Sequence, residues 1–258
     1  RWAPPTVVIF AIIEYEVTLT TPDTSVTVVN TNSNFWSIPV TWIGTAVMSI
    51  RAKDINSRYS TSVTSDVVVN RPSSPSDVTT QVTTAGNGIK VLWTGATPGS
   101  LPIGGYELRP INTLPGSAGV IWRGNTTSVD INQITLGTNE WDLWTFDTDG
   151  AYSAVATDIS YIATAPNAVL ATSITGDFST SLTTSTILIA WEAPTSTFGI
   201  DHYEVSLEYT SPQSTVLNSS RNSTDWEVTA NWLGSATLSV TVYNKLGFAS
   251  TTTTKIYT

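Results

Sequence analysis

The segments Ile187-Leu-Ile-Ala-Trp191-Glu-Ala-Pro194 and Ile200-Asp-His-Tyr203-Glu-Val205 predict two β-strands, because apolar and β-branched residues dominate both and a proline lies between them. The same pattern occurs twice more, with the tryptophan 12 or 13 residues before the tyrosine, as Trp93 with Tyr106 and as Trp2 with Tyr15. The three tyrosines are 91 and 97 residues apart. A repeat of this length is too long for a solenoid and indicates a string of small β-sandwich domains.

The composition of the 258 residues is typical of an all-β fold. Threonine, serine and valine are abundant, ten tryptophans are present, and only 12% of the residues are charged. No segment shows a helical periodicity sustained over the length of a helix. The linkers Asn70-Arg-Pro72-Ser-Ser-Pro75 and Ala163-Thr-Ala-Pro166 separate the repeats, so we expect three domains over residues 1–70, 71–164 and 165–258.

Charge and cysteine content exclude several classes of function. The chain carries a formal net charge of −9 and its 11 basic residues are scattered, which argues against a nucleic-acid groove. It contains no cysteine, so a disulfide framework, thiol catalysis and cysteine-ligated zinc are excluded. The longest apolar run, from Val7 to Ile13, is too short to span a bilayer. We therefore expect neither nucleic-acid binding nor membrane insertion.

Each complete repeat is predicted to form seven short strands in two sheets. In the first repeat, Trp2 stands where the other repeats have already passed through their first strands, so we expect this domain to lack its first strand and much of its second. Alternating residues predict a strand from Trp36 to Trp42 in the first repeat and one from Val169 to Ile174 in the third. Only six strands can be placed in the third repeat, so a seventh is assumed.

The third repeat contains a characteristic series of residues: Trp191 and Pro194, then Ile200 and Tyr203 to Val205, then Val240-Thr-Val242-Tyr-Asn244-Lys-Leu-Gly247-Phe-Ala-Ser250. In this order they resemble the fibronectin type III family, and the resemblance extends over essentially the whole chain. It implies three tandem Greek-key β-sandwiches, the first truncated at its N-terminus, with a structural rather than an enzymatic role.

The chain departs from that family at one corner. Family members usually carry a tyrosine at the start of the sixth strand, whose hydroxyl ties down the preceding corner. Here Ala46, Asn139 and Ala236 stand at that position. The first and third repeats share Trp-Ile/Leu-Gly-Thr/Ser-Ala instead, at residues 42–46 and 232–236. We expect the indole of this motif to pack over the corner that the missing tyrosine would occupy.

Three aromatic residues of the second repeat are candidates for an exposed surface. Aligning Gly137 with the corresponding glycines of the other repeats places Trp141 inward, so Trp144 and Phe146 should face outward on the same strand. Trp122 is expected on a strand that borders this face. An exposed aromatic surface would suit a sugar or a protein contact. The alternative is that a long loop or an adjoining domain covers these side chains.

The loop from Pro4 to Ala11 is more apolar than its counterparts, since it contains Val7, Val8, Ile9 and Phe10. Loops are polar unless something covers them. We therefore expect an interface here, either with another subunit or with an upstream part of the protein. The alternative is that these residues lengthen the strand that follows.

No catalytic, cofactor-binding or metal site is predicted. Asp147-Thr-Asp149-Gly150 lacks the spaced ligands and closing glutamate of a calcium loop and is interpreted as a turn. His202 is the only histidine, so neither a histidine triad nor a multi-histidine metal centre can form. The repeated Glu16, Glu107 and Glu204 fall between inward residues and should point to solvent. The chain is predicted not to be an enzyme.

Low lysine content, abundant threonine and serine, and tryptophan-rich sandwiches without cysteine are similar to the fibronectin type III-like modules of bacteriophage tail-tip, tail-fibre and baseplate proteins. This resemblance implies a structural or adhesive rod in tail assembly or host-surface attachment, located in the virion (phage tail) or outside the cell. The expected partners are like subunits or other tail proteins, and a host-surface glycan or protein. The alternative function is a spacer or carbohydrate-contacting module of a secreted bacterial glycoside hydrolase or surface adhesin.

Overall fold

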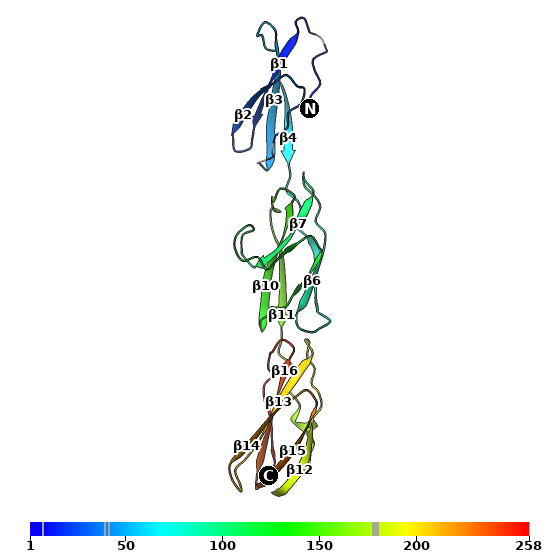
Figure 1. Cartoon of the computed structure of the whole chain (residues 1–258), viewed down its shortest axis with the longest axis vertical. Coiled ribbons are helices and arrows are strands. Elements are labelled where there is room, and N and C mark those ends of the chain that lie inside the picture. The colour runs from blue at the N-terminus through cyan, green and yellow to red at the C-terminus, as the bar shows by residue number, and fades with distance from the viewer. Residues whose placement is uncertain (7, 39, 41, 177–180, 258) are drawn as a thin grey trace.

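The structure is a computed structural model that describes residues 1–6, 8–38, 40, 42–176 and 181–257. Its strands form three successive units stacked end to end as a rod (Figure 1). Every strand pair is antiparallel. The predicted all-β class is therefore confirmed. Within the described ranges, the chain has no helix with the length and apolar character needed to cross a membrane.

Unit 2 is a complete two-sheet sandwich. Its sheets have the strand orders β5-β6-β9 and β11-β10-β7-β8. The strands are β5 (Ser76–Val82), β6 (Ile89–Thr94), β7 (Ile103–Pro110), β8 (Trp122–Gly124), β9 (Ser128–Ile131), β10 (Gly137–Asp147) and β11 (Thr157–Ala163). Alternate residues of β6, β7 and β10 point into one core, which includes Val91, Leu108 and Leu143. The chain crosses from one sheet to the other after β6, after β8 and after β9, so the connections are those of a Greek key.

Unit 3 repeats this plan with a shorter first sheet. The pair β12–β15 shares one core with a sheet of order β14-β13-β16-β17. The strands are β12 (Ser181–Ala190), β13 (Ile200–Tyr209), β14 (Thr215–Arg221), β15 (Asp225–Leu233), β16 (Ala236–Asn244) and β17 (Thr253–Tyr257).

The strand predicted from Val169 to Ile174 is wrong. This segment contains the 3-10 turn η1 (Ala171–Ser173), and only Thr175 beyond it forms a bridge, to Ala190. Val169 and Ile174 are both buried in the core of unit 3. The apolar residues of this segment therefore reflect packing against the core and do not indicate a strand. Conversely, β14 escapes prediction because its Asn-Ser-Ser-Arg end has little strand propensity and the strand pairs only with β13.

Unit 1 consists, among the described residues, of a single sheet in the order β2-β1-β3-β4. Its strands are β1 (Ile12–Thr20), β2 (Val26–Thr31), β3 (Gly44–Asp54) and β4 (Val63–Val69). The order matches that of the four-stranded sheets in the other units.

The strand predicted from Trp36 to Trp42 is not formed by the described residues of that segment. Its counterpart in unit 3 is β15, which pairs along its length with β12. None of the described residues of unit 1 supplies a strand equivalent to β12. Without that partner, the backbone hydrogen bonds that would define a strand here are missing.

The repeated tryptophan and tyrosine make the same contacts in all three units. The backbone N–H of the tryptophan donates to a carbonyl oxygen at 3.0 to 3.1 Å, in the pairs Trp2–Asn34, Trp93–Thr127 and Trp191–Thr224. The indole then packs edge-to-face on the tyrosine ring, with centroids 5.3 to 5.4 Å apart, in the pairs Trp2–Tyr15, Trp93–Tyr106 and Trp191–Tyr203. These contacts give the repeat a structural basis, since each fixes the segment around the tryptophan against the strand that carries the tyrosine, β1, β7 or β13.

A turn of one construction follows β3, β10 and β16. The side-chain oxygen of Asp54, Asp147 or Asn244 accepts the N–H groups two and four residues later, at 2.8 to 3.1 Å. The residue three positions later has a positive φ in each unit. The segment from Asp147 to Gly150 is therefore a turn in which the carboxylate binds the backbone.

The corner before the sixth strand is closed in two ways. Trp42 and Trp232 are buried, as expected for the motif shared by units 1 and 3. In unit 2, the Asn139 side chain accepts the N–H of Thr135 at 2.9 Å and donates to the carbonyl oxygens of Thr135 and Gly137 at 2.7 and 3.0 Å. An amide thus takes the place of the tyrosine hydroxyl.

Candidate functional site

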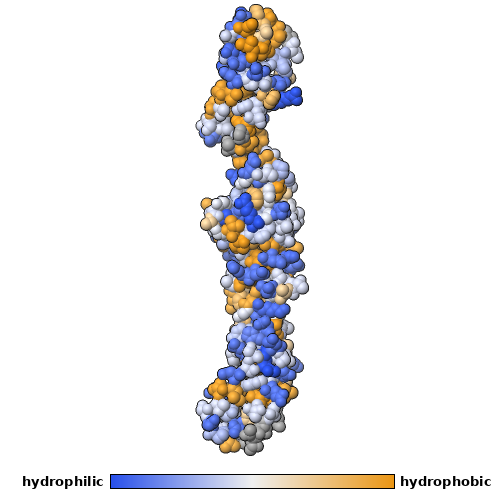
Figure 2. All heavy atoms as spheres, viewed as in Figure 1, coloured by the Kyte–Doolittle hydropathy of each residue, from blue (hydrophilic) through white to orange (hydrophobic). Residues whose placement is uncertain are grey.

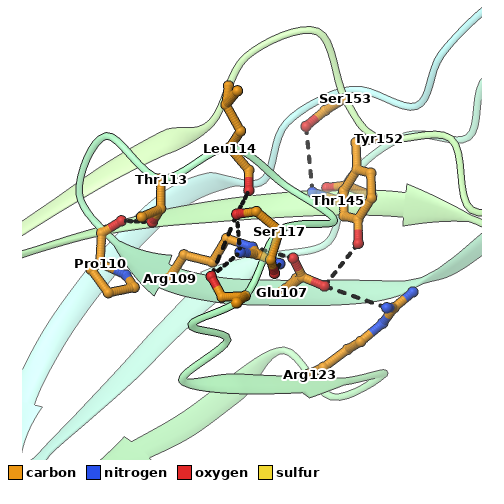
Figure 3. A network of polar contacts seen from close by, with 11 residues as sticks. Glu107, Arg109, Pro110, Thr113, Leu114, Ser117, Arg123, Thr145, Tyr152 and Ser153 are labelled. Carbon is orange, nitrogen blue, oxygen red and sulfur yellow. Dashed lines mark hydrogen bonds and ion pairs between the residues drawn. The ribbon is translucent and has the colours of Figure 1, made fainter.

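The outer face of the second sheet in unit 2 holds a buried ion pair (Figure 3). Glu107 is 0% exposed, and its carboxylate accepts a hydrogen bond from Nε of Arg109, which is also buried. The hydroxyl of Tyr152 donates to the other carboxylate oxygen at 2.8 Å, and Nη1 of Arg123 lies 3.5 Å from the same oxygen. The prediction that Glu107 points to solvent is therefore wrong.

The loop between β7 and β8, residues 111–121, accounts for this burial. The guanidinium of Arg109 donates to Oγ of Ser117 at 3.0 Å and to its carbonyl oxygen at 2.8 Å, which holds the loop over the sheet (Figure 3). Strand alternation correctly places Glu107 away from the core. It carries no information on whether a loop folds back over that side.

Burial on this side of the sheet shifts the ionisation of two groups. Desolvation raises the pKa of the Asp142 carboxyl, although the N–H of Asn112, 2.8 Å away, acts in the opposite direction. Burial also raises the pKa of Tyr152, and its hydrogen bond to Glu107 adds to that effect. Both groups hold the loop or its neighbours in place, so the shifts arise from packing and do not by themselves indicate catalysis.

The equivalent glutamates of the other units remain accessible to solvent. Glu16 is half-buried and accepts two hydrogen bonds from Arg51, at 2.7 and 3.0 Å, which lower the pKa of its carboxyl. Glu204 is exposed and accepts the hydroxyl of Tyr243 at 3.0 Å. The three glutamates share one register position, and the covering loop distinguishes unit 2.

The predicted aromatic surface is not a single exposed face, and Trp122 is the clearest correction. Trp122 pairs with Leu108 across β7 and β8 and therefore shares the inner side of the sheet. It is half-buried, and its ring lies edge-to-face with that of Trp93, 5.8 Å away. Trp122 therefore packs against the core of unit 2.

Trp144 and Phe146 lie on the outer side of the sheet, as predicted, but both are half-buried. Phe146 is covered by the ring of Tyr152, 5.8 Å away, and by the guanidinium of Arg123, 4.0 Å from its centroid. The expectation of a free aromatic platform is therefore corrected, because neighbouring side chains and the loop 111–121 occupy this side of the sheet.

The end of unit 1 that points away from unit 2 is apolar and exposed. Val8, Ile9 and Phe10 lie at this end, and Ile9 is 89% exposed and Phe10 43%. Val7, the fourth residue of the predicted interface, lies outside the described residues. Since β1 begins only at Ile12, Val8 to Phe10 do not lengthen that strand.

Two residues of the turn after β3 extend this apolar surface. Ile55 and Tyr59 are both exposed, and Tyr59 borders a shallow hollow together with Val8, Ile9 and Phe10. Figure 2 shows apolar residues gathered at this end of the rod. We refer to Val8, Ile9, Phe10, Ile55 and Tyr59 as the tip.

Unit 3 docks onto unit 2 through an aromatic side chain. Phe198, in the loop between β12 and β13, is 0% exposed and belongs to the core of unit 2. Its ring lies 6.1 Å from that of Tyr161 in β11. Nζ of Lys245 donates to the carbonyl oxygen of Ala85 at 3.1 Å. Two apolar side chains of the turn after β16 pack against the same core, Leu246 and Phe248.

The junction between units 1 and 2 is more polar. The N–H of Ser100 donates to the carbonyl of Asn70 at 3.0 Å, and the N–H of Asn70 donates to Oγ of Ser100 at 2.9 Å. Arg71 donates to the carbonyl oxygen of Tyr152 at 3.1 Å. Leu101 of unit 2 faces a hollow whose apolar lining from unit 1 comprises Val40, Trp42, Ile43 and Val69.

Sequence reasoning misses both the Glu107–Arg109 pair and Phe198. The signal for Phe198 is positional, since an apolar residue stands five residues before the strand tyrosine in each repeat. The cue for the ion pair is the unusual length of the loop 111–121 between two adjacent strands.

His202 and the acidic residues do not form a reactive group. Nδ1 of His202 lies 2.8 Å from a carboxylate oxygen of Asp201, and its ring stacks on that of Tyr243 with centroids 4.7 Å apart. In the part of the chain that the structure describes, no group of three or more histidine, aspartate and glutamate residues could hold a metal ion.

The chain is similar to chains of known solved structures. No protein-family model matches the chain, and no curated protein matches it. The chain is similar to the crystal structure of the FN1–FN3 domains of chicken CNTN1, with 14% identity over 94% of this chain and 91% of that chain and a TM-score of 0.28. The strand orders and the repeated contacts described above give units 2 and 3 a fibronectin type III-like sandwich fold, and the described residues of unit 1 form the four-stranded sheet of the same fold.

Proposed function

We propose that the chain is a non-enzymatic rod that spaces or presents other parts of a larger assembly. The observation that carries this proposal is the complete burial of Phe198 between units 2 and 3. Bending this junction would expose the side chain, at a cost of about 1.5–3 kcal/mol for a phenylalanine. Units joined in this way behave as a semi-rigid array rather than as beads on a flexible linker.

Small-angle X-ray scattering of the full chain tests the rod. We expect one extended particle, and we expect Phe198→Asp to broaden the distribution of interatomic distances because unit 3 is released from unit 2. Leu188→Asp is the matched control, since Leu188 is an exposed apolar residue of the same unit. A compact wild-type particle, or equal broadening by both variants, would contradict the proposal.

We further propose that this rod is part of a bacteriophage tail tip or tail fibre, where it serves tail assembly or host-surface attachment. The composition of the chain supports this role, and the exposed tip suits contact with like subunits or other tail proteins. Immunogold labelling with an antibody against this chain tests the location. Gold at the tail end of phage particles is the expected result, and gold on bacterial cell surfaces or in the secreted fraction alone would overturn it.

The alternative of a carbohydrate-contacting spacer has less support. A sugar platform would need Trp122 and Trp144 on one open face, but Trp122 packs on Trp93 on the inner side of the sheet while Trp144 lies on the outer side.

A further inference from the structure

The outer face of the four-stranded sheet in unit 3 is hollowed over β14, β13 and β16 (Figure 1). The hollow has a volume of about 610 Å³. Pockets for small ligands typically measure about 300–1,000 Å³, so the size suits such a ligand. The polar side chains that line it include one carboxylate, one amide and several hydroxyls: Glu204, Ser206, Asn218, Ser220, Ser239 and Thr241. We refer to this hollow as the trough.

The strand register explains why the trough forms. Its side chains stand in two rows across β14, β13 and β16, namely Ser220–Glu204–Thr241 and Asn218–Ser206–Ser239. Apart from the glutamate, these side chains are short. The next residues on the same face are longer, with Tyr243 beyond the first row and Glu208 beyond the second. Short side chains between longer ones leave a depression that runs across the strands.

In unit 2 the same face is filled by large side chains. The row through Glu107 is completed by Arg123 and Trp144. Arg109 stands in the second row and holds the loop 111–121 over the sheet. The positions that form the trough in unit 3 are therefore occupied by the chain itself in unit 2.

The three units also differ in what meets the repeated glutamate. Thr241 stands where unit 1 has Arg51, whose guanidinium donates to Glu16 at 2.7 and 3.0 Å. Glu204 instead accepts the hydroxyl of Tyr243 at 3.0 Å. The basic side chains of unit 3 make their contacts elsewhere: Arg221 with Asp225, Lys245 with Ala85 and Lys255 with Ile174. Within the described part of unit 3, hydroxyl groups and solvent therefore meet the charge of Glu204.

The groups that line the trough indicate the class of ligand. Serine and threonine hydroxyls and the Asn218 amide both donate and accept hydrogen bonds, and the Glu204 carboxylate accepts them. The hydroxyls of a saccharide match this set, because each also donates and accepts. An anionic ligand does not match, since Glu204 would repel it. Tyr243, whose ring stacks on that of His202 with centroids 4.7 Å apart, adds an aromatic ring at one end for the apolar face of a sugar.

We propose that the trough binds a neutral saccharide of the host surface, with Glu204 and the neighbouring hydroxyls hydrogen-bonded to the sugar hydroxyls. Strands lie about 4.8 Å apart, so the three strands of the trough span about 10 Å, which accommodates a short oligosaccharide. The inference rests on the proposed role in host-surface attachment and gives that role a ligand class. The site lies on unit 3 and is independent of Trp122 and Trp144 in unit 2.

An array of neutral bacterial-surface oligosaccharides, with anionic and amine-bearing glycans beside them, tests the ligand class. The full chain, labelled with a fluorophore, should bind neutral glycans in preference to the charged ones. Calorimetry with the best-binding glycan should give a dissociation constant on the order of millimolar, since the site is open to solvent. This affinity should be nearly the same at low and high salt, because a neutral ligand brings no charge to be screened.

Two substitutions test the site. Thr241→Arg rebuilds the arrangement of unit 1 and fills the trough, so it should abolish binding. We expect this variant to fold, because unit 1 accommodates the same pair as Arg51 with Glu16. Glu204→Gln keeps the shape and removes the charge, so it should weaken binding by about tenfold. Thr229→Arg is the matched control, since Thr229 is an exposed threonine of β15 in the other sheet, and it should bind as the wild type does.

Three results would overturn the proposal: a full chain that binds no neutral glycan on the array, binding that Thr241→Arg leaves unchanged, or an affinity that falls steeply with salt. The immunogold experiment keeps this failure apart from that of the proposed function. Gold at the tail end without glycan binding removes the trough as a site and leaves the location intact. Glycan binding with gold only on bacterial cells contradicts the location and leaves the site intact.

Discussion

The two junctions of this rod join the same parts of successive units with different chemistry. Between units 2 and 3, a phenylalanine is fully buried and its neighbour Gly86 permits close backbone approach. Between units 1 and 2, Leu101 is half-buried beside a hollow, and Asn70 and Ser100 exchange two hydrogen bonds. The difference indicates that one repeat can set the stiffness of each joint through a single side chain.

The largest expected effect is that of removing the buried anchor. Phe198→Ala should lower the free energy of unfolding by about 3 kcal/mol, because it removes a fully buried ring and leaves a cavity. Leu101→Ala should cost about 1 kcal/mol, since Leu101 is half-buried and already adjoins a hollow. Urea unfolding followed by tryptophan fluorescence measures the two losses in the free energy of unfolding. Equal losses would show that the two junctions contribute equally to stability.

The close approach at Gly86 gives the next prediction. Gly86→Ala should cost about 2 kcal/mol, because the residue has a φ of +72° and its Cβ would clash with the carbonyl of Phe198. Gly116→Ala is the control for backbone strain alone, about 1 kcal/mol, since Gly116 has a φ of +79° with nothing within 4 Å of its Cβ. If thermal unfolding shows the same loss for both, the contact with Phe198 contributes nothing.

A substitution in the opposite direction should make the junctions more alike. Leu101→Phe places the larger side chain against the hollow at the end of unit 1 that faces unit 2. It should raise the free energy of unfolding by about 1 kcal/mol, because more apolar surface is buried. Thermal unfolding of unit 1 measures the gain. A loss of stability would mean that the hollow cannot accept a ring at this angle.

The smallest effects are expected from the polar contacts. Lys245→Met removes a hydrogen bond from an exposed side chain of unit 3 to a carbonyl of unit 2, and Arg71→Met removes one from the linker between units 1 and 2 to the carbonyl of Tyr152. Each should cost less than about 1 kcal/mol, because solvent-exposed charged groups gain little from such contacts. If Arg71→Met lowers the free energy of unfolding more than Leu101→Ala in the same urea titration, polar contacts dominate the junction between units 1 and 2.

Local patterns predict the elements of this fold better than they predict what covers them. The Trp–Tyr spacing and the turn at Asn244 are short-range features, so their contacts recur in every unit as the sequence indicates. The expected exposed position of Trp122 is wrong, because its register with Leu108 depends on a loop whose path the sequence does not reveal. Glu107 was placed correctly on its strand, but the same loop buries it.

Contacts between units were the hardest to predict. Phe198 lies in a loop of unit 3 and is buried in the core of unit 2, so no pattern within either unit marks it as a core residue. The sequence shows that Phe198, Leu101 and Phe10 lie at the same distance before the tyrosine of their repeats. It does not show that this position contacts the preceding unit, which the structure reveals for Phe198. The polar edge strand β14 was missed for a related reason, because it is stabilised by pairing with β13 rather than by its own composition.

The central claim is that the side chain at this repeated position sets the rigidity of each joint, and distance distributions between spin labels test it most directly. The chain has no cysteine, so label pairs can be introduced at the exposed sites Thr64 with Ser160, across units 1 and 2, and Ser160 with Ser220, across units 2 and 3. We predict a narrow distribution across units 2 and 3 that Phe198→Ala broadens, and a broader one across units 1 and 2. Equal widths that Phe198→Ala leaves unchanged would contradict the account.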